Sequence, residues 1–205
     1  MRKFYLLILF LLALTHSYSQ EVYFLTGSNI TKYNFSSQAE SMVTALHAGT
    51  GSFYEVGYDF SLNSDALSYS AAFTLNEYNA LAGSPASSYS WNTRYAGAQV
   101  SLNYMRSMTK RFKLGLRGGL NISKMVYGKQ NLNGTIYDLS DQKEFSGLFF
   151  SYFGGVSANY KLNESGYLSI GYGYGNGLNT ANSTQEKVIF DNQQILFGIH
   201  FNINK

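Results

Sequence analysis

Apolar and polar residues alternate along most of the chain with a period of two. In residues 54–62 every even position is apolar, and every odd position is polar or glycine. Similar alternation recurs in six further segments, which are residues 67–76, 96–104, 112–123, 148–160, 168–175 and 195–203. Because successive side chains of a β-strand point to opposite faces, each segment predicts a strand with one apolar and one polar face.

An extended-looking first segment, residues 21–33, brings the number of predicted strands to eight, although its two faces are ambiguous. The clear segments run about 10 to 14 residues, whereas strands of soluble domains usually have about 5 or 6. A tilted strand needs roughly 9 to 11 residues to cross the hydrocarbon layer of a membrane. The lengths therefore favour membrane-spanning strands.

The connections between these strands alternate between short and long. Residues 63–65, 106–110 and 162–165 are short turns, and residues 34–50, 79–90, 126–144 and 178–186 are long and polar. Outer-membrane barrels show this asymmetry, and a sheet in lipid must close because an open edge would leave backbone groups unpaired. We therefore expect an all-β fold, a single eight-stranded antiparallel up-and-down transmembrane β-barrel over residues 20–205, with both termini on the short-turn, periplasmic side.

The N-terminus has the three-part order of a secretory signal. Arg2 and Lys3 precede an apolar run over residues 4–14, and residues 17–19 are Ser-Tyr-Ser. The run is too short to span a bilayer as a helix, so residues 1–19 are predicted to be a cleaved signal peptide of the general secretory route. An uncleaved anchor or a buried helix is the alternative. Export of a barrel predicts the outer membrane as its location and outer-membrane lipid as its surroundings.

Composition agrees with a barrel and argues against other classes. The chain has one Pro, 20 Gly, 18 Tyr and 15 Phe, which suit strands and crowded barrel walls. It has no Cys, so disulfides and thiolate metal sites are absent from the sequence. Without Arg2 and Lys3, the 15 basic residues fall to 13 against 12 acidic ones. This near balance gives no support for a nucleic-acid partner.

Four charged residues fall on the predicted polar faces, Glu55 and Asp59 in one strand and Lys113 and Arg117 in another. The interior of an eight-stranded barrel is just filled by side chains, so these opposite charges are expected to form a network across the lumen. Counting from the turns places Asp59 and Arg117 at a similar depth. Phe149 and Phe153 also occupy positions that alternate onto the inward face of their strand. The lumen is therefore expected to be filled and not to conduct freely.

Aromatic residues are expected near the short turns, where outer-membrane barrels carry an aromatic girdle. Four of them lie on apolar faces at this level, Phe60, Tyr104, Phe112 and Tyr160.

The histidines are the first candidates for chemistry. His16 leaves with the leader, His47 lies in a predicted loop, and His200 is predicted to face the lumen. A pairing of His200 with Ser169 or Ser157 is one hypothesis, but spacing does not establish it, and a hydrogen-bonded lumen residue is the preferred interpretation. We therefore assign no catalytic residue and expect no enzymatic activity and no cofactor.

The acidic residues of the longest predicted loop, Asp138, Asp141 and Glu144, could bind a divalent cation. Their irregular spacing favours a solvated loop instead. We assign no metal site.

Several segments resemble a known family. The leader ends in Ser-Gln-Glu, and the other segments are residues 51–58 (GSFYEVGY), 90–95 (SWNTRY), 143–148 (KEFSGL) and 197–201 (FGIHF). Together they resemble the small outer-membrane β-barrel domain family of Bacteroidota that is related to PorT. The resemblance implies an eight-stranded barrel and an outer-membrane address, and it implies no activity. The chain departs from the usual pattern in ending with Lys205 instead of an aromatic residue.

Three functions remain open. The leading hypothesis is a non-enzymatic structural or surface-interaction barrel, whose long loops contact a surface or secretion-system protein. The alternative is a narrow pore or a secretion-associated component. The third is a lipid-modifying barrel enzyme that uses His200.

Overall fold

The computed structural model describes residues 20–36, 46–62, 66–84, 87–140, 142, 145, 147–179 and 187–203, so the predicted signal peptide lies outside the described residues. The described part consists of ten strands and their turns. They are β1 (Gln20–Ser36), β2 (Leu46–Ser61), β3 (Leu67–Glu77), β4 (Ala80–Ser84), β5 (Ser87–Ser107), β6 (Phe112–Leu132), β7 (Thr135–Asp138), β8 (Leu148–Asn163), β9 (Gly166–Asn179) and β10 (Lys187–Asn202). No helix in this part of the chain is long and apolar enough to cross a membrane.

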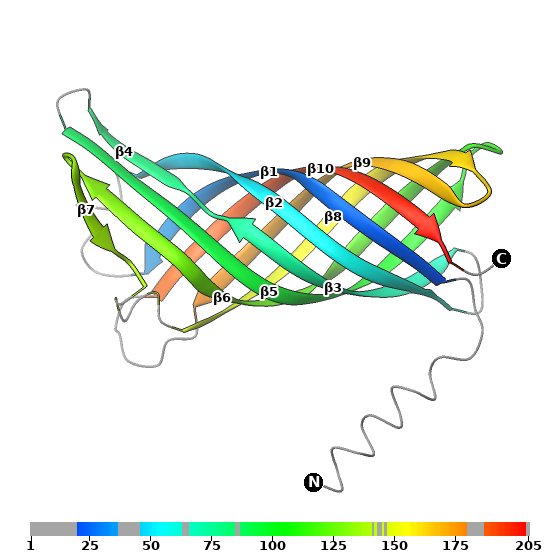
Figure 1. Ribbon diagram of the computed structural model, residues 1–205, viewed down its shortest axis with the longest axis horizontal. Coiled ribbons are helices and arrows are strands. Elements are labelled where there is room, and N and C mark those ends of the chain that lie inside the picture. The colour runs from blue at the N-terminus through cyan, green and yellow to red at the C-terminus, as the bar shows by residue number, and fades with distance from the viewer. Residues whose placement is uncertain are drawn as a thin grey trace, which may run out of the picture.

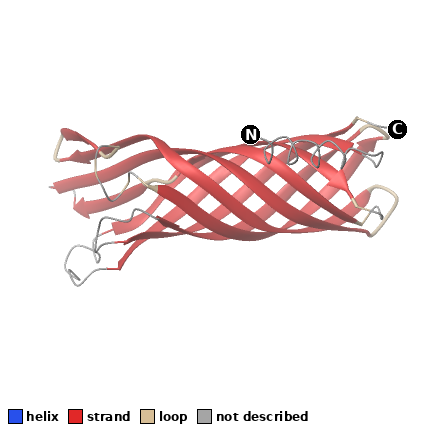
Figure 2. Cartoon of the chain, turned by 90° about the horizontal axis from the view of Figure 1, so that it is seen from below, coloured by secondary structure: helices blue, strands red, loops and turns tan. Residues whose placement is uncertain are grey.

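Eight of the strands form a closed antiparallel ring in the order β1-β2-β3-β5-β6-β8-β9-β10, and β1 pairs with β10 to close it. Figures 1 and 2 show the elongated barrel from two sides, with the strands strongly tilted. Each ring strand pairs with its sequence neighbours in the ring. The predicted eight-stranded up-and-down barrel is therefore confirmed, and β4 and β7 are additions at one end.

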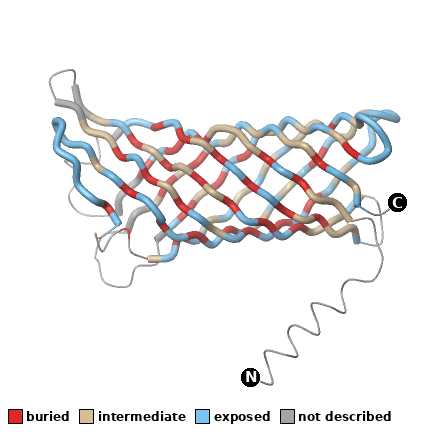
Figure 3. The backbone as a smooth tube through the Cα atoms, in the orientation of Figure 1, coloured by how far each residue is buried: buried red, intermediate tan, exposed pale blue. Residues whose placement is uncertain are grey.

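Burial alternates along the ring strands, as the bands of Figure 3 show. In β6, Leu114, Leu116 and Leu120 are exposed, whereas Asn121 and Ser123 are buried. The exposed positions of the other ring strands are also largely apolar, with Val56, Phe73, Val100, Val156 and Phe197 each more than half exposed. An apolar outer belt around a polar interior is the arrangement that a lipid surrounding stabilises.

The apolar belt has the height of a bilayer core. On β6 it covers residues 112–122 and is followed by the exposed Lys124, which agrees with the roughly 9 to 11 residues that a tilted strand needs. On β3 and β5 the belt ends where the outward-facing Glu77 and Arg94 form an ion pair of 2.6 Å. Strand residues beyond this polar level therefore lie outside the membrane-spanning segments.

The long connections contain more strand than the sequence predicted. Part of each of three predicted loops is regular sheet: β2 begins at Leu46, β4 pairs with both β2 and β5, and β6 continues to Leu132 and pairs with β7. The β6–β7 turn is Asn133-Gly134 with φ of 52° and 87°, and Asn-Gly is a strong two-residue hairpin signal. The prediction of long polar loops was therefore wrong for these residues, which extend the barrel wall past the belt (Figure 1).

The start of β1 and the end of β10 lie at the same end of the barrel as the short turns (Figure 1). The Ile203 N–H donates to the Gln20 carbonyl at 2.8 Å, which joins the two ends of the ring. Residues 108–111 and 164–165 form two of the predicted short turns, whereas residues 63–65 lie outside the described part. We call this the short-turn end, and the opposite end, which carries β4 and β7, the extended end.

Aromatic residues of five ring strands lie near the short-turn end, where the girdle was expected. Tyr104 and Tyr160 are about half exposed, and Phe112 pairs in register with Tyr160. The ring of Phe60 stacks on Tyr69 at 4.8 Å between centroids.

Candidate functional site: the layered lumen

A bidentate ion pair occupies the lumen in the short-turn half of the barrel. Arg117 of β6 reaches Glu55 of β2, with Nη1 3.2 Å from Oε2 and Nη2 in contact with Oε1. The Glu55 side chain is 1% exposed and also accepts from the Tyr23 hydroxyl at 2.7 Å and from Gln99 Nε2 at 3.0 Å. The Arg117 guanidinium lies 5.4 Å from the Phe153 ring centroid. Both charges are therefore held by several partners, as a buried pair requires.

Arg117 does not pair with Asp59, the residue that counting from the turns placed at a similar depth in the lumen. Asp59 instead accepts from Asn103 Nδ2 at 3.1 Å, one layer nearer the short-turn end. Lys113 lines the open cavity at that end and takes no part in the Arg117–Glu55 pair. Strands in a barrel tilt and are staggered, so equal counts from the turns do not give equal heights across the lumen.

A second layer farther from the short turns is uncharged and polar, and it centres on Asn29. The Asn29 amide oxygen accepts from Asn192 Nδ2 at 3.1 Å and from Gln194 Nε2 at 2.8 Å, and its amide nitrogen donates to Asn76 Oδ1 at 3.2 Å. Asn29 has 0% exposure. These amides satisfy one another and form a hydrogen-bonded polar layer across the middle of the barrel.

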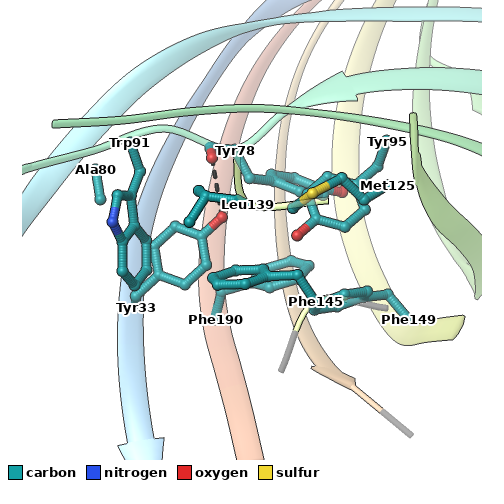
Figure 4. Close-up of a cluster of buried hydrophobic side chains, with 10 residues drawn as sticks. All are labelled: Tyr33, Tyr78, Ala80, Trp91, Tyr95, Met125, Leu139, Phe145, Phe149 and Phe190. Carbon is teal, nitrogen blue, oxygen red and sulfur yellow. Dashed lines mark hydrogen bonds between the residues drawn. The ribbon is translucent and has the colours of Figure 1, made fainter. Parts of the chain in front are cut away.

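A cluster of aromatic and aliphatic side chains closes the extended end, and we call it the plug (Figure 4). Its members are Tyr33, Tyr78, Ala80, Trp91, Tyr95, Met125, Leu139, Phe145, Phe149 and Phe190, each at most 7% exposed. Trp91 meets Tyr33 edge-on at 5.2 Å and Phe145 at 5.4 Å, and the Tyr33 hydroxyl donates to the Tyr78 carbonyl at 2.9 Å. The plug fills the barrel above the amide layer.

Part of the plug comes from connections and not from strands of the ring. Tyr78 lies between β3 and β4, and Leu139 and Phe145 lie between β7 and β8. Phe149 has the inward position that the sequence predicted and is 1% exposed. The inserted residues gave no sequence signal, because strand periodicity does not say which way a connecting segment folds.

The short-turn end opens instead into cavities. A vestibule of about 600 Å³ is lined by residues that include Glu21, Lys113 and Tyr167. A smaller inner cavity of about 80 Å³ is lined by Arg117, Ser169 and His200, among others. The two cavities share Asp59, Met105 and Asn159 as lining residues. The lumen is therefore accessible from the short-turn end only as far as the inner cavity, beyond which the amide layer and the plug follow.

His200 has the lumen position that parity predicted, and the structure surrounds it with specific partners. Its Nε2 lies 2.9 Å from Ser169 Oγ, and its Nδ1 lies 2.6 Å from Glu21 Oε1. Its ring stacks on Tyr167 at 4.2 Å and on Tyr23 at 5.6 Å. Of the two serines weighed for His200, Ser169 is the one in contact, whereas Ser157 accepts from Asn159 Nδ2 at 3.0 Å. Glu21 was missed because the faces of the first strand were ambiguous.

Among the described residues, no group of three His, Cys, Asp or Glu side chains could hold a metal ion. The acidic residues of the longest predicted loop are placed as follows. Asp138 Oδ1 accepts from the Ser140 hydroxyl at 2.5 Å and from the Ser140 backbone N–H at 2.8 Å, and these two hydrogen bonds lower the pKa of the Asp138 carboxyl. Asp141 and Glu144 lie outside the described residues.

No family model matches the sequence, and no curated protein matches it. Solved structures do share its fold. Neisserial surface protein A is 13% identical, with 89% of this chain and 97% of that chain covered at a TM-score of 0.54. The outer membrane protein OprG from Pseudomonas aeruginosa is 12% identical, with 92% and 98% covered at 0.50. The outer membrane protease OmpT from Escherichia coli is 10% identical, with 90% and 97% covered at 0.51.

Identities this low show the fold alone. The shared fold, together with the closed ring and the apolar belt, defines this chain as a small transmembrane β-barrel of the outer-membrane type.

Proposed function

We propose that the protein is an exported, closed outer-membrane barrel that uses its extended end to bind a protein partner at the cell surface. The plug carries this proposal. Its buried side chains occupy the extended end of the lumen, which supports a closed barrel that acts through its surface and not as a channel. The partner class that we propose is another surface protein or a component of a secretion system.

The proposed orientation places the short turns and both termini in the periplasm, with residues 1–19 removed as a signal peptide. An even number of strands puts the start of β1 and the end of β10 at one end. Short turns on the periplasmic side and longer extensions outside are usual in outer-membrane barrels. The extended end would then project from the cell.

Apolar side chains beyond the polar level of Lys124 and Arg94 support a binding role. Ile136 and Tyr137 of β7 are 62% and 47% exposed, and Val126 of β6 is 58% exposed. These residues lie past the belt and gain nothing from lipid. Apolar groups exposed to water are candidate points of protein contact.

A pore is the weaker candidate, because buried aromatic rings occupy the extended end of the lumen. Neither the belt nor the plug requires catalysis, a cofactor or nucleic acid. The role that these features support best is therefore interaction.

Cysteine labelling and photo-crosslinking test both halves of the proposal. The chain has no Cys, so single Asn133→Cys and Met108→Cys variants report the extended and short-turn ends. A membrane-impermeant maleimide applied to intact cells should label Asn133→Cys only, and both variants once the cells are opened. A photo-crosslinking residue at Tyr137 should then give a defined adduct with one protein, while the same residue at Arg111 should not. Labelling of Met108→Cys in intact cells would refute the orientation. Absence of a Tyr137 adduct on cells with the correct orientation would refute the binding role.

A further inference from the structure

Three polar side chains from neighbouring strands converge where the inner cavity meets the vestibule. Ser169 lies on β9, His200 on β10 and Glu21 on β1, and all three face the lumen. His200 stands between the other two, with Nε2 2.9 Å from Ser169 Oγ and Nδ1 2.6 Å from Glu21 Oε1. A carboxylate at Nδ1 favours the imidazole tautomer that carries its proton on that nitrogen. Nε2 is then free to accept the serine proton.

The surroundings hold this arrangement in place. Tyr167 donates its hydroxyl to the same Glu21 oxygen at 2.6 Å and stacks its ring on His200 at 13° between planes. Ser169 pairs in register with Gly198 of β10. A side chain at Gly198 would overlap the Ser169 hydroxyl and approach His200 Nε2 to 3.0 Å. The missing side chain at position 198 therefore leaves room for the contact between serine and histidine.

The three residues also adjoin reachable space. Ser169 and His200 line the inner cavity of about 80 Å³, and Glu21 lines the vestibule of about 600 Å³. Arg117 and its ion-pair partner Glu55 also line the inner cavity. A cavity of this size accommodates a short acyl group, while the larger vestibule accommodates the group to which the acyl is attached.

We propose that Ser169, His200 and Glu21 form an acyl-transfer site that takes short acyl esters from the short-turn end of the barrel. This activity goes beyond the proposed surface role and uses the opposite end of the molecule. Ser169 is the nucleophile, His200 is the general base and acid, and Glu21 positions the imidazole.

The reaction balances without any cofactor. Ser169 Oγ bonds to the ester carbonyl carbon as its proton moves to His200 Nε2. The carbonyl electron pair returns as the bond to the alcohol oxygen breaks, and the His200 proton goes to that oxygen. Water then attacks the acyl-serine in the same way, giving the free acid and restoring Ser169.

The test uses p-nitrophenyl acetate with the folded, full-length barrel in detergent. Nitrophenolate release is followed, and acid-quenched protein is mapped for an acetyl group by mass spectrometry. We expect acetyl on Ser169 of the wild type and at least about a 100-fold slower acetylation of Ser169 in His200→Gln. In Gly198→Ala the added methyl displaces the hydroxyl from His200, so we expect slower acetylation there as well. Ser157→Ala is the matched control, because Ser157 lines the same cavity without contacting His200.

Heat-shift gels establish that each variant is folded. Ser169 acetylation at the wild-type rate in folded His200→Gln, or at an equal rate in heat-denatured wild type, would overturn the proposal. So would folded wild type without any acetyl group on Ser169. The last result concerns the wild-type chain alone and does not depend on how the variants fold. None of these outcomes bears on the surface role, which is tested at the other end of the barrel.

Discussion

Arg117 and Glu55 face each other from β6 and β2 and form a bidentate ion pair inside the barrel, with Arg117 Nη1 3.2 Å from Glu55 Oε2. The Glu55 carboxylate is almost completely shielded from solvent. Removing one partner of such a pair leaves the other charge buried without compensation.

Arg117→Leu should therefore destabilise the barrel by about 3–5 kcal/mol. Chemical unfolding in detergent can be followed by the fluorescence of Trp91, the single tryptophan, which lies in the plug. Lys110→Gln is the control, because Lys110 is exposed in a short turn and should change stability by no more than about 0.5 kcal/mol. Equal effects of the two changes would contradict the assignment of the pair.

The double variant Glu55→Gln with Arg117→Leu should recover part of that loss. Tyr23 and Gln99 now donate to separate oxygens of Glu55. The single amide oxygen of the new side chain can still accept from one of them, and no uncompensated charge remains. The same unfolding measurement checks this. A double variant less stable than Arg117→Leu alone would show that the carboxylate has other strong partners.

Two adjacent phenylalanines on β8 point to opposite faces of the barrel wall, one into the plug and the other onto the outer belt. Phe149 is 1% exposed in the plug, and Phe150 is 41% exposed on the outer face. Phe149→Ala should cost about 3–5 kcal/mol through the cavity it leaves, and Phe150→Ala should cost clearly less. If thermal unfolding ranks the two variants in the reverse order, the inward and outward faces of β8 have been exchanged.

The Glu77–Arg94 pair beyond the belt gives a pH-dependent contribution. Partial burial raises the pKa of Glu77, but hydrogen bonds from Arg94 and from the Ser52 backbone outweigh it, so the pKa lies below its usual 4.5. A carboxyl with a lowered folded-state pKa stabilises the protein above the unfolded-state pKa, and the contribution is lost as pH falls through the folded-state pKa. The unfolding midpoints of wild type and Glu77→Gln should therefore differ at neutral pH and converge once the pH falls below the folded-state pKa of Glu77. A difference that is constant across this range would exclude the ionised pair as its cause.

Strand parity allowed the barrel and its inward residues to be predicted from the sequence. It placed Glu55, Arg117, Phe149 and His200 in the lumen, because side-chain direction in a strand depends only on position along the chain. Heights across the lumen depend on tilt and stagger, which the sequence does not show. Counting from the turns therefore gave Arg117 and Asp59 a similar depth, although Arg117 pairs with Glu55.

The plug and the serine–histidine contact were harder to predict for different reasons. Leu139 and Phe145 enter the plug from the β7–β8 connection, and no periodicity governs connections. Glu21 reaches His200 through β1–β10 pairing, which joins opposite ends of the chain. The Asn133-Gly134 hairpin, by contrast, was readable from its turn residues.

Conductance tests the central claim, a barrel closed by its plug, most directly. Purified, folded protein in planar bilayers should give no stable steady current, because the plug and the amide layer leave no continuous path through the lumen. A folded variant that combines Tyr95→Ala and Phe149→Ala removes two rings from the plug. Any current that this variant carries and the wild type does not is current that the plug prevents. A stable wild-type channel whose conductance changes with these two plug residues would contradict the closed barrel and favour a pore.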